Sequence, residues 1–170
     1  MRLLGAILAG GNARRFGSDK ASAKWNGKPL MDWVAQALVA QCESVALCGR
    51  VAPGFLSLPD TPHDGLGPLG GLNAALSYAS LHGFTHVLSA GVDAPNLPVD
   101  LKDALAGEGA AIVDSQPVVG LWPSSILAEL DAYISQDGRA LYGFANRIGA
   151  RRITLATPLM NVNRPDDLAP

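Results

Sequence analysis

Short apolar runs alternate with helically spaced apolar positions along this chain. The segments 3–8, 45–47 and 86–89 are largely apolar on consecutive positions, which is typical of strands buried on both faces of a parallel sheet. Apolar residues recur every three or four positions over 30–41 and 69–81, which predicts two helices with one apolar face each. The first half of the chain therefore predicts strands separated by helices.

The second half continues this alternation. Glycines and prolines are concentrated in 10–28 and 51–71, which we expect to be loops. After residue 90 the pattern predicts, in chain order, a helix over 99–105, strands over 110–113 and 118–121, helices over 124–134 and 139–148, and strands over 153–155 and 160–162. This alternation predicts an α/β fold, a three-layer α/β/α sandwich around a mostly parallel, Rossmann-like sheet, in a single domain over 1–170.

Composition narrows the possible classes of protein. Hydrophobic residues make up 48% of the 170 positions and charged residues 16%, which allows a large buried core. The net charge of −2 is too balanced for a broad nucleic-acid or membrane surface, so we expect neither partner. No apolar run approaches the ~20 residues that cross a bilayer. We expect a cytoplasmic protein that is a monomer or a weak homo-oligomer, in which Cys42 and Cys48 are buried thiols.

The segment after the first predicted strand has the chemistry of a phosphate-binding loop. Residues 8–20 have the sequence LAGGNARRFGSDK, in which glycines let backbone N–H groups approach an anion and Arg15 and Lys20 supply positive charge. The segment lacks the Gly-Lys-Ser/Thr of P-loops and the Gly-x-Gly-x-x-Gly of dinucleotide-binding folds. Because a Gly-Gly pair alone also occurs in simple turns, the prediction depends on the cations that follow it.

Two aspartates are further candidates for a site. Asp60 precedes the sequence GPLGG at 67–71, where proline after glycine predicts the start of a helix. Asp93 follows the predicted strand 86–89 and precedes two prolines that fix its loop. Either aspartate could instead be a turn or capping residue. Ligands of such folds lie beyond the carboxyl ends of the strands, so we expect the glycine-rich loop and Asp93 to lie at one rim.

A fourth motif lies near the C-terminus, where residues 161–168 have the sequence NVNRPDDL. Its structural interpretation is a strand end followed by a helix with acidic residues in the first turn.

Taken together, these motifs resemble those of the molybdenum cofactor guanylyltransferases. Segment 8–20 is similar to the family's Leu-x-Gly-Gly-x-x-x-Arg-Met-Gly-x-Asp-Lys, with Phe16 in place of methionine, and 25–30 is similar to its Gly-Lys-Pro-Leu continuation. Segment 67–71 resembles Gly-Pro-Leu-Ala-Gly, and 161–168 resembles Asn-(Val/Ile)-Asn-Thr-Pro-Glu-(Glu/Asp)-Leu. The segment around Asp93 resembles Cys-Asp-x-Pro-x-(Leu/Ile)-Pro. The resemblance runs from about residue 3 to 168, and it departs from the family at Phe16, Val92, Ala94, Gln116 and Arg164.

The resemblance implies a sheet of the nucleotidyltransferase type and a role for each motif. It implies transfer of GMP from GTP to a molybdopterin-type cofactor with release of pyrophosphate, in a Mg²⁺-dependent reaction. The catalytic residues would be Arg15, Lys20 and Asp93, with Asp93 as the metal ligand. The nucleotide-binding residues would be Leu8, Ala9, Gly10, Gly11, Asn12, Lys20, Asp60, Gly67, Pro68, Leu69 and Gly71. The acceptor-binding residues would be Asn161, Asn163 and Arg164.

Several alternatives remain at this point. Asp64 competes with Asp60 as the carboxylate that contacts the nucleoside. A related transferase specific for CTP or for a sugar phosphate would carry the same loops, and a non-catalytic nucleotide-binding paralogue would share the fold. The histidines have no metal-ligand spacing, and no Gly-x-Ser-x-Gly elbow indicates a serine hydrolase.

Overall fold

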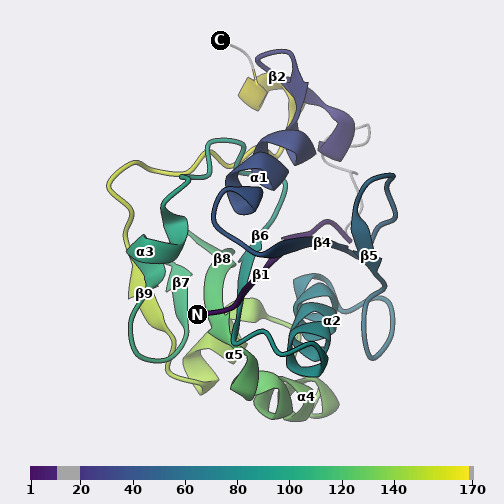
Figure 1. The fold of residues 1–170 in the computed structure, drawn as a ribbon, viewed down its shortest axis with the longest axis vertical. Helices are drawn as coiled ribbons and strands as arrows, with labels where there is room; N and C mark the ends of the chain where they lie inside the picture. Colours follow the sequence, from purple (N-terminus) through teal and green to yellow (C-terminus); the bar gives the residue numbers. More distant parts are fainter. Residues whose placement is uncertain (11–19, 169–170) are drawn as a thin grey trace.

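Seven strands form one mixed sheet at the centre of the molecule. The structure is a computed structural model that describes residues 1–10 and 20–168, and Figure 1 shows its arrangement. The strand order is β5-β4-β1-β6-β8-β7-β9. The bounds are β1 Leu3–Leu8, β4 Ser44–Cys48, β5 Leu56–Leu58, β6 His86–Ala90, β7 Ala111–Val113, β8 Gln116–Pro123 and β9 Arg151–Ile153. Every strand of this sheet runs in one direction except β8, which is antiparallel to both of its neighbours.

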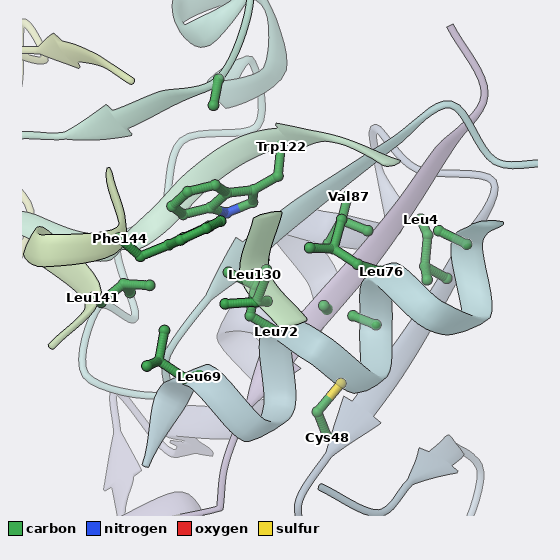
Figure 2. Packing of buried hydrophobic residues seen from close by; sticks show 14 of the residues in the cluster. Leu4, Cys48, Leu69, Leu72, Leu76, Val87, Trp122, Leu130, Leu141 and Phe144 are labelled. Carbon is green, nitrogen blue, oxygen red and sulfur yellow. The ribbon is translucent and has the colours of Figure 1, made fainter. Parts of the chain in front are cut away.

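Helices cover both faces of the sheet and create two separate cores. α1 (Leu30–Val39) and α3 (Leu101–Leu105) lie on one face, while α2 (Pro68–Leu81), α4 (Leu127–Ser135) and α5 (Leu141–Arg147) lie on the other. Strand β1 serves both cores because side chains alternate along a strand: Leu4 packs under α2, whereas Leu3 and Ile7 pack under α1. Figure 2 shows the α2 face, where Leu72 and the indole of Trp122 lie among buried apolar side chains.

A smaller unit sits above the sheet, beside the N-terminus of α1. Strands β2 (Lys24–Trp25) and β3 (Lys28–Pro29) form a hairpin whose turn residues, Asn26 and Gly27, have positive φ angles. Short 3₁₀ turns span Lys20–Ser22, Ser124–Ile126 and Pro165–Leu168. Leu30 and Val162 are fully buried in a third, small core, with Ala23, Trp25, Met160 and Leu168 packed around them.

The sandwich and the mostly parallel sheet predicted from the sequence are confirmed, with local differences, one of which is that β9 spans 151–153 where a strand over 153–155 was predicted. The predicted strand over 160–162 is wrong, because the side chains of Asn96 and Gln116 and a single backbone bond from Val162 to Asp93 hold that segment in place of a strand ladder. The predicted loop 51–71 contains β5, and the predicted loop 10–28 contains the β2–β3 hairpin. No helix within the described residues is long and apolar enough to span a membrane.

Candidate nucleotide-binding site

Four chain segments leave the sheet at the carboxyl ends of its parallel strands, which are together called the edge below. The parallel strands β1, β4, β5 and β6 end together there, and Gly10, Gly49, Asp60 and Asp93 each follow one of these strands within three residues. Because β1 and β6 are paired neighbours, with Ile7 opposite Ala90, the glycine-rich loop and the Asp93 loop leave from adjacent strands. The single rim expected from the sequence is present.

A small pocket lies over β1, β4 and β5 at this edge. Its volume is about 160 Å³. The residues that line it come from these three strand ends and from the N-terminus of α2: Leu8, Gly10, Cys48, Asp60, Gly67, Pro68 and Gly71. Six of the seven were predicted as nucleotide-binding residues, and Cys48 was not. Of the other predicted residues, Ala9 donates its backbone N–H to the Cys48 carbonyl oxygen at 3.0 Å, and Leu69 is buried in the core under α2.

Two glycines, Gly49 and Gly70, pack closely against Gly10 and Asp60, which line this pocket. A Cβ at Gly49 would lie 2.6 Å from the Gly10 Cα and 2.9 Å from the Asp60 Oδ1, distances that side-chain carbons do not tolerate. A Cβ at Gly70 would lie 3.0 Å from the Asp60 Cβ. Gly49 also has a φ of +81°, which other residues rarely adopt. Gly70 lies in the predicted segment 67–71, whereas sequence reasoning missed Gly49, although a glycine shortly after a predicted strand is the same signal that Gly10 gives.

Asp60 lies in the pocket without a partner for one of its oxygens. Its Oδ1 is inaccessible to solvent and accepts no hydrogen bond within the described part of the chain. Burial raises the pKa of the Asp60 carboxyl above its usual range, and the charge of nearby Asp64 raises it further. An inaccessible, unpaired carboxylate oxygen is costly to bury in its charged form, which favours the protonated form of Asp60.

Cys48 forms part of the pocket wall and has no reactive thiolate. Burial raises the pKa of its thiol to about 12, and Asp60 adds to the shift. Burial likewise raises the pKa of the Cys42 thiol to about 12. Both side chains are free thiols, as the sequence predicted, and both remain protonated at neutral pH.

A charged pair lies on the β6 side of the edge. The Lys20 Nζ is 3.8 Å from the Asp93 Oδ1, and the two side chains are 21% and 32% exposed. Burial raises the pKa of the Asp93 carboxyl above its usual range, while Lys20 opposes that shift. A half-buried carboxylate next to a single ammonium group can hold a divalent cation whose other ligands are phosphate and water oxygens.

Hydrogen bonds hold the C-terminal segment 158–163 against the loop after β6, which contains Asp93 and Asn96. Asn96 holds it at two points, since its Nδ2 donates to the Pro158 carbonyl oxygen at 3.1 Å and its Oδ1 accepts from the Met160 N–H at 2.8 Å. Gln116, buried at the start of β8, donates to the Met160 carbonyl oxygen at 2.7 Å. Further along, the Val162 N–H donates to the carbonyl oxygen of Asp93 itself at 2.9 Å.

These contacts bring the predicted acceptor residues to the same edge. Val162 is buried, whereas Asn161 and Arg164 on either side of it are exposed and Asn163 is partly exposed. The Asp167 carboxylate accepts from the backbone N–H groups of Asn163 and Arg164 at 2.8 and 3.0 Å, and these bonds lower the pKa of Asp167. The turn that carries the two asparagines is therefore fixed from both ends.

Three of the predicted residues lie outside the described residues. Gly11, Asn12 and Arg15 belong to the segment 11–19, so their predicted contacts with phosphate stay predictions. Over residues 1–10 and 20–168, no three His, Cys, Asp or Glu side chains gather in a way that would hold a metal by themselves.

The fold of this chain is shared by several solved structures, a cytidylyltransferase among them. The structure of molybdopterin-guanine dinucleotide biosynthesis protein A from Archaeoglobus fulgidus shares the fold with a TM-score of 0.76 at 22% identity, over 99% of this chain and 95% of that one. The structure of 2-C-methyl-D-erythritol 4-phosphate cytidylyltransferase from Thermus thermophilus shares it with a TM-score of 0.71 at 17% identity, over 99% and 96%. A structure of Rv0371C from Mycobacterium tuberculosis in complex with manganese also shares it, with a TM-score of 0.67 at 12% identity, over 98% and 96%.

The particular family follows from sequence similarity. Residues 5–150 match the model of the MobA-like NTP transferase domain. A molybdenum cofactor guanylyltransferase from Cereibacter sphaeroides is 39% identical over 99% of this chain and 95% of its own length. The chain belongs to the MobA-like NTP transferase family, which confirms the resemblance seen in the motifs, and it is an enzyme of that family.

Proposed function

We propose that this chain transfers GMP from GTP to the terminal phosphate of a molybdopterin-type cofactor and releases pyrophosphate. Its activity is that of a molybdenum cofactor guanylyltransferase, as full-length relatives at 39% and 35% identity carry that name. One observation supports this assignment most strongly. The unpaired Asp60 carboxylate follows β5 and Asp93 of the Lys20–Asp93 pair follows β6, at the same end of the sheet with β4 and β1 between them, a separation that suits a base on one side and a triphosphate on the other.

The pocket around Asp60 suits the guanine base. A carboxylate accepts two hydrogen bonds side by side, and guanine presents its N1–H and N2–H₂ donors along one edge. Uracil and cytosine do not present this pair of donors. The pocket beside Asp60 would take a flat ring, and a base that cannot donate a hydrogen bond to the carboxylate would be disfavoured.

The triphosphate would lie between the glycine-rich loop and Lys20. We assign backbone N–H groups of residues 10–12 to the phosphates, and the charges of Arg15 and Lys20 to the transferred and leaving groups. Asp93 would hold a Mg²⁺ ion together with phosphate oxygens, and that ion would neutralise charge that develops on them. The residues present fit such an ion, since one carboxylate with phosphate ligands is a common Mg²⁺ site in proteins.

The acceptor would approach from the C-terminal segment. An oxygen of its terminal phosphate attacks the α-phosphorus of GTP, the bond from that phosphorus to the bridging oxygen breaks, and pyrophosphate leaves with the bonding electrons. The attacking oxygen is already anionic, so positioning and charge stabilisation do most of the work. We assign Asn161, Asn163 and Arg164 to the acceptor, because Val162 between them is bonded directly to Asp93.

Pyrophosphate release tests this proposal. Purified protein with Mg²⁺ and molybdopterin should release pyrophosphate with GTP and far more slowly with CTP, ATP or UTP. Asp93→Ala should abolish turnover while the far-ultraviolet circular dichroism stays unchanged. A matched change at the opposite end of the sheet, Glu108→Ala in the exposed turn before β7, should leave turnover intact. Equal rates with GTP and CTP would overturn the base assignment, and an active Asp93→Ala enzyme would overturn the metal assignment.

A further inference from the structure

Asp60 has to be held in place by something other than its own side chain. Its Oδ1 accepts no hydrogen bond from any described residue, and the side chain lies so close to Gly49 and Gly70 that an added Cβ there would come within 2.9 and 3.0 Å of it. A carboxylate in this setting keeps its position only if the backbone that carries it is fixed. The next residue, Thr61, supplies that restraint.

Thr61 is tied to α2 by two hydrogen bonds. Its backbone N–H donates to the Gly70 carbonyl oxygen at 3.2 Å, and its hydroxyl donates to the Asn73 Oδ1 at 2.5 Å. The first bond is local to the pocket. The second reaches one turn further along α2, to a side chain that is only 3% exposed.

Asn73 is held in turn by α4. Its Nδ2 donates to the Asp131 Oδ1 at 2.7 Å, which leaves its Oδ1 facing Thr61. A carboxylate can only accept hydrogen bonds, so Asp131 pairs with the NH₂ end of the Asn73 amide. The oxygen end of the amide is thereby directed at Thr61. A chain of two hydrogen bonds therefore runs from the exposed surface of α4, through a buried amide, to the residue beside Asp60.

Apolar packing alone does not explain why an amide side chain is buried at position 73. An amide in a helix core costs free energy unless its donors and acceptors are paired, and its neighbours on the inner side of α2, such as Leu72 and Leu76, are aliphatic. An apolar residue would serve that core as well. What only the amide can do here is connect Asp131 to the Thr61 hydroxyl.

We propose that Asn73 is a positioning residue for recognition of the nucleoside base, acting through Thr61 on Asp60, with Asp131 fixing the orientation of its amide. The inference rests on the proposed role of Asp60 in base binding. Loss of the chain would let the Asp60 backbone shift while the phosphate side of the site, at Lys20 and Asp93, stays in place. Binding and selection of the base should suffer, and the transfer step should not.

Steady-state kinetics with GTP and ITP test the proposal, because inosine lacks the N2 amino group that distinguishes guanine. Asn73→Leu and Thr61→Val should each raise the KM for GTP about tenfold, the scale of one buried hydrogen bond of about 1.4 kcal/mol. The kcat at saturating GTP should stay within about twofold, and the preference for GTP over ITP should shrink. Asp131→Ala should act in the same direction, whereas Asp131→Asn, which can still accept from Asn73, should restore most of the wild-type KM.

Thr85→Val is the matched control for Thr61→Val. The Thr85 hydroxyl also makes hydrogen bonds, with the backbone of Arg2 and with the His86 Nδ1, but it lies at the opposite end of the sheet. That variant should keep the wild-type KM and GTP preference. If Thr61→Val behaves like Thr85→Val, or if Asn73→Leu lowers kcat and leaves KM unchanged, the positioning role is refuted.

Asp60→Asn separates this inference from the proposed function. If Asp60→Asn distinguishes GTP from ITP as the wild type does, the base contact itself is wrong. If Asp60→Asn loses that selectivity while Thr61→Val and Asn73→Leu keep it, the base contact stands and the chain from Asp131 has no part in it.

Discussion

Replacing Gly49 by alanine tests the geometry of the nucleotide pocket most directly. The new Cβ would lie 2.6 Å from the Gly10 Cα, 3.0 Å from the Gly10 nitrogen and 2.9 Å from the Asp60 Oδ1. Two of these three atoms belong to backbone, which cannot rotate away as a side chain can. Either the glycine-rich loop or the turn after β4 has to move by about 1 Å to restore ordinary contact distances of about 3.5–4 Å.

The expected cost has two parts. A φ of +81° costs a non-glycine residue about 1–2 kcal/mol, part of which is offset because alanine lowers the entropy of the unfolded chain. Overpacking against backbone adds about 1–3 kcal/mol. The sum, about 2–4 kcal/mol, corresponds to a fall in Tm of about 4–16 °C for a chain of this size. A displacement of about 1 Å at Gly10 should also lower kcat/KM for GTP about 100-fold.

Gly54→Ala provides the control for backbone strain. Gly54 has a φ of +83°, almost the same as Gly49, but an added Cβ there would meet no atom within 4 Å. It should lower Tm by about 2–4 °C, for a cost of about 1 kcal/mol, and leave KM unchanged. Thermal unfolding and GTP kinetics of the two variants side by side decide the matter. Equal Tm values together with a wild-type KM for Gly49→Ala would refute the packing argument.

Four further predictions concern the charges and the C-terminal segment. Lys20→Ala should lower kcat by about 100-fold or more in the pyrophosphate assay, since it removes a charge-stabilising donor, and a change in KM alone would make it a binding residue only. Asp93→Asn should raise the Tm of the ligand-free protein by about 1–3 °C at pH 7. Burial raises the folded-state pKa of Asp93, so the protonated side chain favours folding at low pH, and this contribution to stability is lost as pH rises through that pKa. The gain in Tm from Asp93→Asn should therefore vanish in acid. The KM for GTP should rise as the pH falls through the raised pKa of Asp60, because the protonated carboxyl binds the base less well. Asp64→Asn should move that rise to lower pH, since the charge of Asp64 raises the pKa of Asp60. An unchanged pH profile would exclude Asp64 as a cause of the raised pKa. Asn96→Ala should raise the KM for molybdopterin about tenfold and leave the KM for GTP unchanged, because it releases segment 158–163; equal effects on both substrates would contradict this.

Sequence patterns predicted the parts of the fold that burial controls. The long, strongly patterned segments became β1, α1, α2 and β6 within a few residues of their predicted ends. Strand β5 was missed because its three residues, Leu56–Leu58, form a short edge strand within a segment rich in proline and glycine. Segment 160–162 has the composition of a strand, but the side chains of Asn96 and Gln116 satisfy the backbone of Met160 in place of a neighbouring strand.

Site residues that belong to a continuous sequence motif were predicted. Site residues that only the fold brings together, from distant parts of the chain, were missed. Residues 8–10 and 67–71 were found because they belong to glycine-rich runs. Gly49 was missed because its importance comes from its approach to Gly10, nearly forty residues away. Gln116 was noted only as a departure from the family, and its position follows from the direction of β8: in an antiparallel strand the first residue, not the last, lies at the edge that carries the site.

The pocket beside Asp60 has a consequence for the lifetime of the enzyme in a cell. A protein whose pocket forms only in the folded state is less stable empty than filled, and a ligand present at 100 times its Kd adds about 2.7 kcal/mol, or about a hundredfold fewer unfolded molecules. Quality-control proteases act on the unfolded population, so abundant GTP should protect the enzyme from degradation. When the GTP supply falls, the cell should lose the enzyme along with its substrate, and the capacity for guanylylation would follow the availability of guanine nucleotide without any dedicated regulator.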